Sequence, residues 1–381
     1  MRQTASLGEY RRSGEMYLAL ELGWRDWKLA FSTGLGDPVF QASIPARDRR
    51  RFEAAMDGAR RQLGLAKGCE VASCYEAGRD GFWVDRWLRS LGIVNLVVDS
   101  SSIEVNRRTR RIKTDRIDAR KLLSMLMRYE AGEGGVWSVV RVPSESEEDG
   151  RHLHRQLRTL KKEQTRLINR IKGLLASQGV DGRMGRRGLL TPLEQMRRWD
   201  GSALPGGLRR RLEVELARHA FLHQQVLACE AQAKEVMSKS EGKAAADIRR
   251  LAQLRAIGRH GAIVLVREFG WRGFRNRREV GALAGLAPTP FQSGASFREG
   301  GISRAGNRHV RGIIVDLAWG WLRLQPGSEL SGWYQRRFAA GGSRVRRIGI
   351  VALARKLLIA LWRYWAKGQM PEGAVLKSSA A

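Results

Sequence analysis

The first hundred or so residues alternate between short apolar runs and charged or glycine-rich breaks. The first three runs alternate partly between apolar and polar positions, which is typical of strands joined in a meander. Later stretches have the three- and four-residue apolar spacing of helices, one of them closed by Gly64 and the last opened by a Thr/Asp cap. The pattern predicts strands at 16–22, 27–32, 37–44, 69–76 and 93–99, and helices at 46–64, 80–92 and 114–129. This order is that of an RNase H-like α/β fold, a mixed sheet flanked by helices.

Two long, charge-rich stretches follow, at 148–179 and 206–237, with Leu, Ile and Val at helical spacing. A Gly- and Pro-containing connector at 180–206 separates them, so we expect an antiparallel helical coiled coil. About 30 helical residues span roughly 45 Å. The pair suits a spacer or dimerisation coil as well as it suits a nucleic-acid clamp.

The chain from about residue 250 is mostly helical and rich in Arg and Trp. Its segment "LRAIGRHGAIVLVREFG" has the Gly-x-x-Gly spacing of a helix-hairpin-helix turn, whose backbone amides can hold a phosphate. The Trp and Leu stripes at 305–324 and 348–368 are typical of core helices. We therefore predict three domains, at 1–145, 146–245 and 246–381.

Charge indicates the partner of the chain. Its 381 residues carry 69 Lys plus Arg against 38 Asp plus Glu, a net charge of +31, which favours nucleic acid. An Arg-rich genome would also give a basic protein. Three cysteines are too few for a disulfide framework and suggest a reducing compartment. The sequence lacks a signal peptide and a run of about 18 apolar residues. We expect a cytoplasmic, nucleoid-associated protein without a membrane span.

Four acidic residues fall at the positions from which an RNase H-like sheet supplies metal ligands. Glu21 lies in the first strand, Glu76 at the end of the fourth, and Asp115 and Asp118 at the start of the helix after the fifth. Hard carboxylate oxygens suit Mg²⁺, with Mn²⁺ as a substitute. Metals held in this way can activate an oxygen nucleophile and stabilise the leaving oxygen.

Each acid also has a structural explanation. Asp115 and Asp118 suit a helix cap and dipole, and Glu76 suits a turn. Glu21 lies among apolar residues, where an unpaired buried carboxylate is costly, so it has the strongest argument for a function. Further candidates for the ligand set are Asp85 and Asp99.

Two sets of motifs resemble a known family. "YEAGRDGFW" with "VNRRTRRIKTDRIDARKL", and "VREFG" with "GALAGLAPTPFQSGASFREGGISRAGNRHVRG", are similar to the DEDD-type insertion-sequence transposases. Members of that family are RNA-bridged DNA recombinases whose first domain resembles RuvC, a Holliday-junction resolvase. The resemblance covers both ends of the chain in the same order, with a coiled coil between them.

The resemblance implies an acidic tetrad at Glu21, Glu76, Asp115 and Asp118 and a nucleophilic serine at Ser293. It also implies target and donor double-stranded DNA, a structured non-coding bridge RNA, and a homodimer that forms a tetramer in the synapse. The family pattern usually has Asp in the first strand, where this chain has Glu21. That difference moves the carboxylate and puts the metal geometry in question.

Ser293 lies in a Gly/Ser-rich segment that, without the resemblance, would suit an idle loop. Ser296 and Ser303 are alternative nucleophiles, and Ser303 also suits a helix N-cap. His309 lies nearby in sequence. The basic run before Asp115 and the cations after Ser293 predict nucleic-acid contacts at Arg107, Arg108, Arg110, Arg111, Lys113, Arg298, Arg304, Asn307 and Arg308.

Together these features predict a transposase or site-specific recombinase that rejoins DNA through a phosphoserine link. A metal-dependent, structure-selective nuclease with an idle serine is the second hypothesis. The third is a basic RNA- or DNA-binding scaffold whose tetrad has decayed at Glu21.

Overall fold

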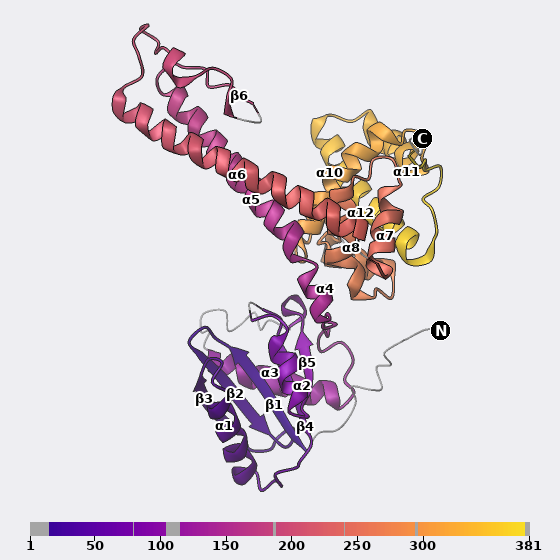
Figure 1. The fold of residues 1–381 in the computed structure, drawn as a ribbon. Helices are drawn as coiled ribbons and strands as arrows, with labels where there is room; N and C mark the ends of the chain where they lie inside the picture. Colours follow the sequence, from indigo (N-terminus) through magenta and orange to yellow (C-terminus); the bar gives the residue numbers. More distant parts are fainter. Residues whose placement is uncertain are drawn as a thin grey trace. The chain divides into compact units, whose positions relative to one another are not determined.

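A computed structural model describes residues 15–78, 80–103, 115–185, 188–239, 241–293 and 296–377, without the side chains of 101, 115–118, 237, 239 and 290–299. The chain divides into two compact units, Met1–Pro143 and Ser144–Ala381 (Figure 1). The helical middle and the C-terminal segment therefore share one unit, and the three-domain division stays a prediction. No helix in the described part of the chain combines the length and the apolarity that crossing a bilayer requires.

The first unit contains a five-stranded mixed sheet in the order β3-β2-β1-β4-β5. β1 pairs with β2 in antiparallel and with β4 in parallel orientation, and β4 pairs with β5 in parallel. The strands are β1 (Met16–Leu22), β2 (Asp26–Ser32), β3 (Phe40–Pro45), β4 (Val71–Glu76) and β5 (Val94–Val98). The mixed α/β architecture expected from the sequence is thus confirmed.

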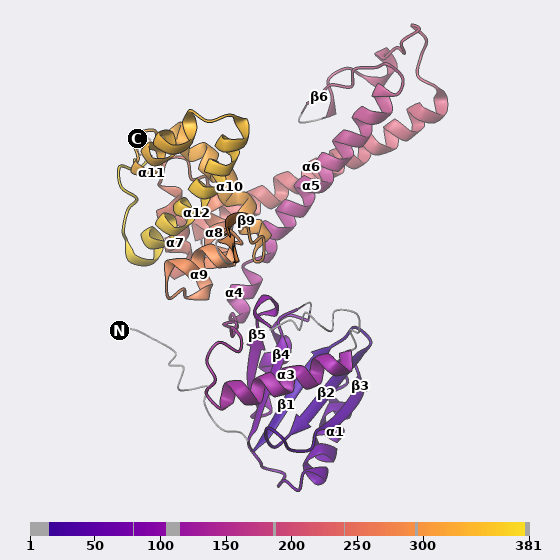
Figure 2. The same cartoon turned by 180° about the vertical axis from the view of Figure 1, so that it is seen from behind.

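Alternation along the strands gives this sheet two apolar faces. Leu18 and Leu20 of β1 face a core shared with the helices α1 (Arg49–Gln62) and α2 (Trp83–Ser90). Ala19 of β1, between those two leucines, faces a second core formed with α3 (Asp115–Glu130). Figure 2 shows α3 lying across its face of the sheet.

The second unit begins with the short helix α4 (Glu145–Asp149), which is followed by the predicted helical hairpin. α5 (His152–Ala176) and α6 (Gly206–Lys239) pack along each other. Leu157 meets Val226 near one end, and Ile171 meets Leu212 farther along, so the two helices are antiparallel. The connector folds into a small hairpin of β6 (Met184–Gly185) and β7 (Gly188–Leu189).

Within the described residues, six further helices enclose the largest apolar core, and its members confirm that most of the Trp and Leu stripes are structural. Trp321, Leu357 and Leu358 are fully buried there, whereas Trp319 is half exposed. The helices are α7 (Lys243–Ala252), α8 (Arg259–Phe269), α9 (Arg277–Leu283), α10 (Arg308–Leu324), α11 (Glu329–Tyr334) and α12 (Ser343–Lys367).

A two-stranded hairpin, β8 (Pro288–Ser293) and β9 (Ser296–Ile302), lies between α9 and α10 in the chain. Two glycines fix its base. Gly285 and Gly306 have φ angles of +66° and +110°, and a Cβ there would approach backbone oxygens to 2.4 Å and 2.2 Å. Side chains cannot be accommodated at these points, which explains the glycines of "AGLAP" and "AGN".

Candidate functional site

The register of the central strands sets two of the expected acids side by side. β1 and β4 are parallel, with Leu20 opposite Tyr75, and the next residue in each strand is Glu21 and Glu76. Both acids fall two residues after members of the α3-side core, so the strand alternation gives them the same face. They therefore share the carboxyl edge of the sheet.

Glu21 is half-buried rather than buried, and Glu76 is exposed. The expectation that Glu21 is a costly buried carboxylate is therefore wrong. It stands near the end of its strand, opposite Lys28 of β2 in the register. Glu21 stays a candidate ligand because it lies beside Glu76.

The direction of α3 brings its first turn toward the same edge. Glu130, at the end of α3, acts electrostatically on Tyr17 at the start of β1: burial, and then this carboxylate, raise the pKa of the tyrosine. The Sγ of Cys74 donates to the carbonyl of Leu122, at 3.7 Å, in the middle of both elements. α3 therefore runs opposite to β1 and β4.

Asp118 precedes Leu122 by four residues, about 6 Å of helix rise, on the side of Glu21 and Glu76. Asp115 lies almost one further turn away. The backbone positions of all four expected acids thus approach one edge of the sheet, although the side chains of Asp115 and Asp118 lie outside the described residues.

The two further candidates differ from these acids. Asp85 is buried in α2, where one oxygen accepts from Nδ2 of Asn95 at 2.8 Å and the other from Nε of Arg89 at 2.9 Å. Its carboxylate is committed to a structural network. Asp99 follows β5 at the carboxyl edge and is half-buried, so it stays a candidate.

Ser293 lies in the second unit, as the last residue of β8, opposite Ser296 of β9. The segment is therefore a strand pair and not a loop. Five residues of extended chain separate Ser293 from Pro288, about 17 Å from the base of the hairpin. The Ser293 side chain lies outside the described residues, as do those of Ser296 and Arg298.

The N-cap of α10 is Asn307, so Ser303 does not have the alternative role of N-cap. The Asn307 side chain accepts from the backbone amides of His309 and Val310 at 2.9 and 3.1 Å. The basic residues expected before Asp115 lie outside the described part of the chain, and their nucleic-acid contacts stay predictions: Arg107, Arg108, Arg110, Arg111 and Lys113.

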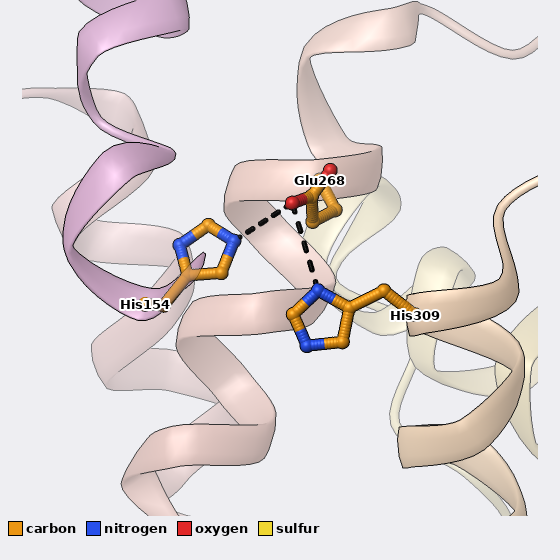
Figure 3. A group of neighbouring side chains, drawn as sticks. All are labelled: His154, Glu268 and His309. Atoms are coloured by element: carbon orange, nitrogen blue, oxygen red, sulfur yellow. Dashed lines mark hydrogen bonds and ion pairs between the residues drawn. The ribbon is translucent and has the colours of Figure 1, made fainter. Parts of the chain in front are cut away.

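The second unit contains a buried cluster of polar side chains. Of its members, only Asn307 is among the site residues expected from the sequence. Glu268 of α8 accepts from Arg155 of α5 through both oxygens, at 2.6 and 2.8 Å. Nε2 of His154 lies 2.9 Å from Oε1, and Nδ1 of His309 lies 3.7 Å from the same oxygen (Figure 3). Nδ2 of Asn307 donates to Oε2 at 3.3 Å. The cluster ties α5, α8 and α10 together.

Electrostatics keep Glu268 ionised. Burial alone would raise its pKa, but hydrogen bonds from Arg155, His154 and His309 lower it far below its usual range. The pKa of His154 is lowered, chiefly by burial and against the pull of Glu268.

His154, Glu268 and His309 present ligand atoms within 4.8 Å of one another, close enough to hold a metal ion. Mg²⁺ prefers oxygen ligands, and this set supplies one carboxylate and two imidazoles. Arg155 already binds both carboxylate oxygens and brings a positive charge, which disfavours a cation. We interpret the cluster as a buried junction between helices.

The amino-acid sequence is similar to those of known transposases. Residues 248–335 match the family model described as Transposase IS116/IS110/IS902 family. The chain is 40% identical to "Putative transposase y4rJ" of Sinorhizobium fredii, over 96% of this chain and 95% of that protein. It is 28% identical to "Probable family 20 transposase" of Pseudomonas aeruginosa, over 66% of this chain and 72% of that protein.

Proposed function

The chain belongs to the IS116/IS110/IS902 family of transposases, and we propose that it cuts and rejoins DNA with an acidic tetrad, a divalent metal and a serine nucleophile. It therefore acts in the rearrangement of mobile-element DNA. The observation that carries the finer proposal is the parallel register of β1 and β4, with Glu21 beside Glu76 at the carboxyl edge.

We propose an RNase H-like, RuvC-like assignment for the first unit. Its support is the strand order with one antiparallel meander and two parallel additions, and helices on both faces. Three β-strands followed by alternating helices and strands are what that fold requires.

Glu21, Glu76, Asp115 and Asp118 would hold Mg²⁺, because this donor set consists entirely of hard oxygens and two of the acids are neighbours across parallel strands. The bound metal would supply charge stabilisation at the phosphate oxygens. By holding the metal, the carboxylates would place its positive charge, and with it the scissile phosphate, at the edge of the sheet.

Ser293 is the proposed nucleophile. Its Oγ forms a bond to phosphorus while the P–O bond to the leaving sugar oxygen breaks, and the hydroxyl proton passes to that oxygen. The phosphoserine diester retains the energy of the broken bond, so a sugar hydroxyl of the second DNA can reverse the step and join strands. Ser293 falls within the segment that matches the family model.

The family resemblance extends the proposal to a structured non-coding RNA that pairs with target and donor DNA. The same resemblance extends the proposal to a homodimer that becomes a tetramer when two DNAs are joined. The net charge of +31 is suited to two polyanionic partners.

Replacement of the nucleophile tests the proposal. Ser293→Ala should abolish recombination and remove a protein–DNA adduct that resists denaturant in the unaltered protein, whereas Ser296→Ala, its cross-strand neighbour, should retain both. EDTA should prevent the adduct in every variant. An undiminished adduct in Ser293→Ala would reject this nucleophile, and DNA cleavage that never yields an adduct would favour the nuclease hypothesis.

A further inference from the structure

A cationic cavity of about 300 Å³ opens beside the Glu268 cluster within the second unit. One side comes from α5 and the other from the start of α10. Its lining is polar throughout and comprises Arg155, Arg158, Thr159, Lys162, Glu268, Asn307, Arg308 and His309. Four of these side chains are basic, and one is acidic.

The single acid, Glu268, cannot neutralise the positive charge of the cavity. Glu268 is bound through both oxygens to Arg155. Within the described part of the chain, Arg158, Lys162 and Arg308 have neither a hydrogen bond nor an ion pair to a carboxylate. Three cations therefore face the cavity without a hydrogen bond or ion pair to an acid of the described chain, and Glu268 acts on Arg158 only through its charge.

Repulsion among these cations lowers the pKa of two of them. Repulsion from Arg158, and then burial and Arg308, lower the pKa of Lys162. Burial, and then repulsion from Arg308, lower the pKa of Arg158. An anion between these side chains would relieve that repulsion.

His309 adds a second, independent feature. Its side chain is 8% exposed, and its Nδ1 faces Glu268. Its Nε2 is buried without a hydrogen-bond partner in the described structure, and Figure 3 shows this atom pointing away from Glu268. A buried polar atom of this kind is costly unless a ligand completes it. With hydrogen on both ring nitrogens, His309 can donate to Glu268 through Nδ1 and to a phosphate oxygen through Nε2.

We propose that this cavity binds one phosphodiester group of a nucleic-acid backbone. Arg158 and Lys162 are one helical turn apart and project from the same side of α5. Arg308 begins α10, where the helix dipole also favours an anion. The site rests on the proposed function in so far as nucleic acid is the substrate, and it gives α5 a contact with that substrate beyond its role as a spacer.

The test compares Arg158→Gln/Lys162→Gln with a control, Lys172→Gln/Arg210→Gln. Both pairs remove one Arg and one Lys, and the control residues are exposed on the same helical hairpin. Binding is measured by fluorescence anisotropy against salt, with a labelled DNA duplex and with an RNA duplex of the same sequence. Thermal unfolding is followed in parallel, in inorganic phosphate and in chloride of equal ionic strength.

The cavity variant should bind at least one duplex about tenfold more weakly than the control does. The slope of log affinity against log salt should become shallower by about one unit. Phosphate should raise the Tm of the unaltered protein and the control by more than it raises that of the cavity variant, in which only its general stabilising effect remains. The duplex that is affected identifies the source of the phosphate, DNA or RNA.

Equal binding and equal phosphate stabilisation of the two double variants would overturn the site. If the unaltered protein nevertheless forms the Ser293 adduct, the failure belongs to this inference alone. If the unaltered protein binds neither duplex, the proposed function fails together with it.

Discussion

Glu21 lies in β1 beside Glu76 of β4, and this position supports its proposed role as a metal ligand. We predict that Glu21→Gln lowers DNA cleavage by at least about a hundredfold, because a lost metal ligand removes several kcal/mol of transition-state stabilisation. Glu21→Asp should retain or improve cleavage, since the charge is kept. Cleavage is measured at saturating Mg²⁺.

Glu70→Gln is the matched control for Glu21→Gln. Glu70 is an exposed acid that directly precedes β4, at the amino end of the strand and opposite the proposed metal edge. It should cleave like the unaltered protein. Full activity of Glu21→Gln would remove Glu21 from the ligand set.

His260 gives a prediction on pH at the same scale. Burial, and then the charges of Lys161, His154 and His309, lower its pKa from 6.5 to about 4. Between these values the unfolded chain takes up a proton that the folded chain does not, so stability must fall as the pH falls from about 6.5 toward 4. His260→Gln should flatten this part of the curve of unfolding free energy against pH.

The comparison variant is His152→Gln, in which an exposed histidine at the start of α5 is replaced. The unfolding midpoint in urea, measured at several pH values, reports the slope for each protein. An identical slope in His260→Gln and in the unaltered protein would contradict the assignment.

Residues fixed by strand position were accessible from sequence, while residues fixed by tertiary contacts were not. Glu21 and Glu76 followed from the strand order, since parallel neighbours end at one edge. Arg155 and Glu268 meet across 113 positions, and no local pattern specifies that pairing. The signal available was an acid in the apolar run "AIVLVREF", where burial demands a partner.

At the scale of elements, the antiparallel packing of α5 and α6 depends on a narrow apolar seam. Ile171 is fully buried between α5, α6 and the connector. We predict that Ile171→Ala costs about 2–4 kcal/mol of unfolding free energy, since it leaves a cavity in the seam. Urea denaturation followed by circular dichroism measures the loss.

Leu227→Ala provides the contrast, because Leu227 lies on α6 and is 51% exposed. It should change the unfolding free energy by less than about 0.5 kcal/mol. Similar losses in both variants would mean that the seam does not stabilise the hairpin in the way its packing indicates.

Periodicity predicted most elements because each buries one face. The expected strand at 37–44 begins only at Phe40, and the stretch before it contains Pro38, which has no N–H to donate to a ladder. The connector strands β6 and β7 have two residues each, too short for any periodicity. The hairpin at Ser293 resembled a loop because the two prolines of β8 and the two glycines of β9 interrupt the alternation.

At the scale of the whole molecule, the expected chemistry is divided between two units. Glu21 and Glu76 belong to Met1–Pro143, and Ser293 belongs to Ser144–Ala381. The proposed cleavage requires carboxylates and serine at one phosphate. The two sets therefore act together either within one chain or between two chains, and sequence patterns do not distinguish these cases.

We predict that they act between chains, as the family resemblance implies. Ser293→Ala and Glu76→Ala should each be inactive alone, and their mixture should regain cleavage, because one composite site in a mixed dimer has an intact serine and intact carboxylates. Such sharing would delay cutting until partners assemble. Activity is measured after co-refolding or subunit exchange, with differently tagged chains to verify that mixed dimers form. If verified mixed dimers remain as inactive as either parent, each site is built within one chain.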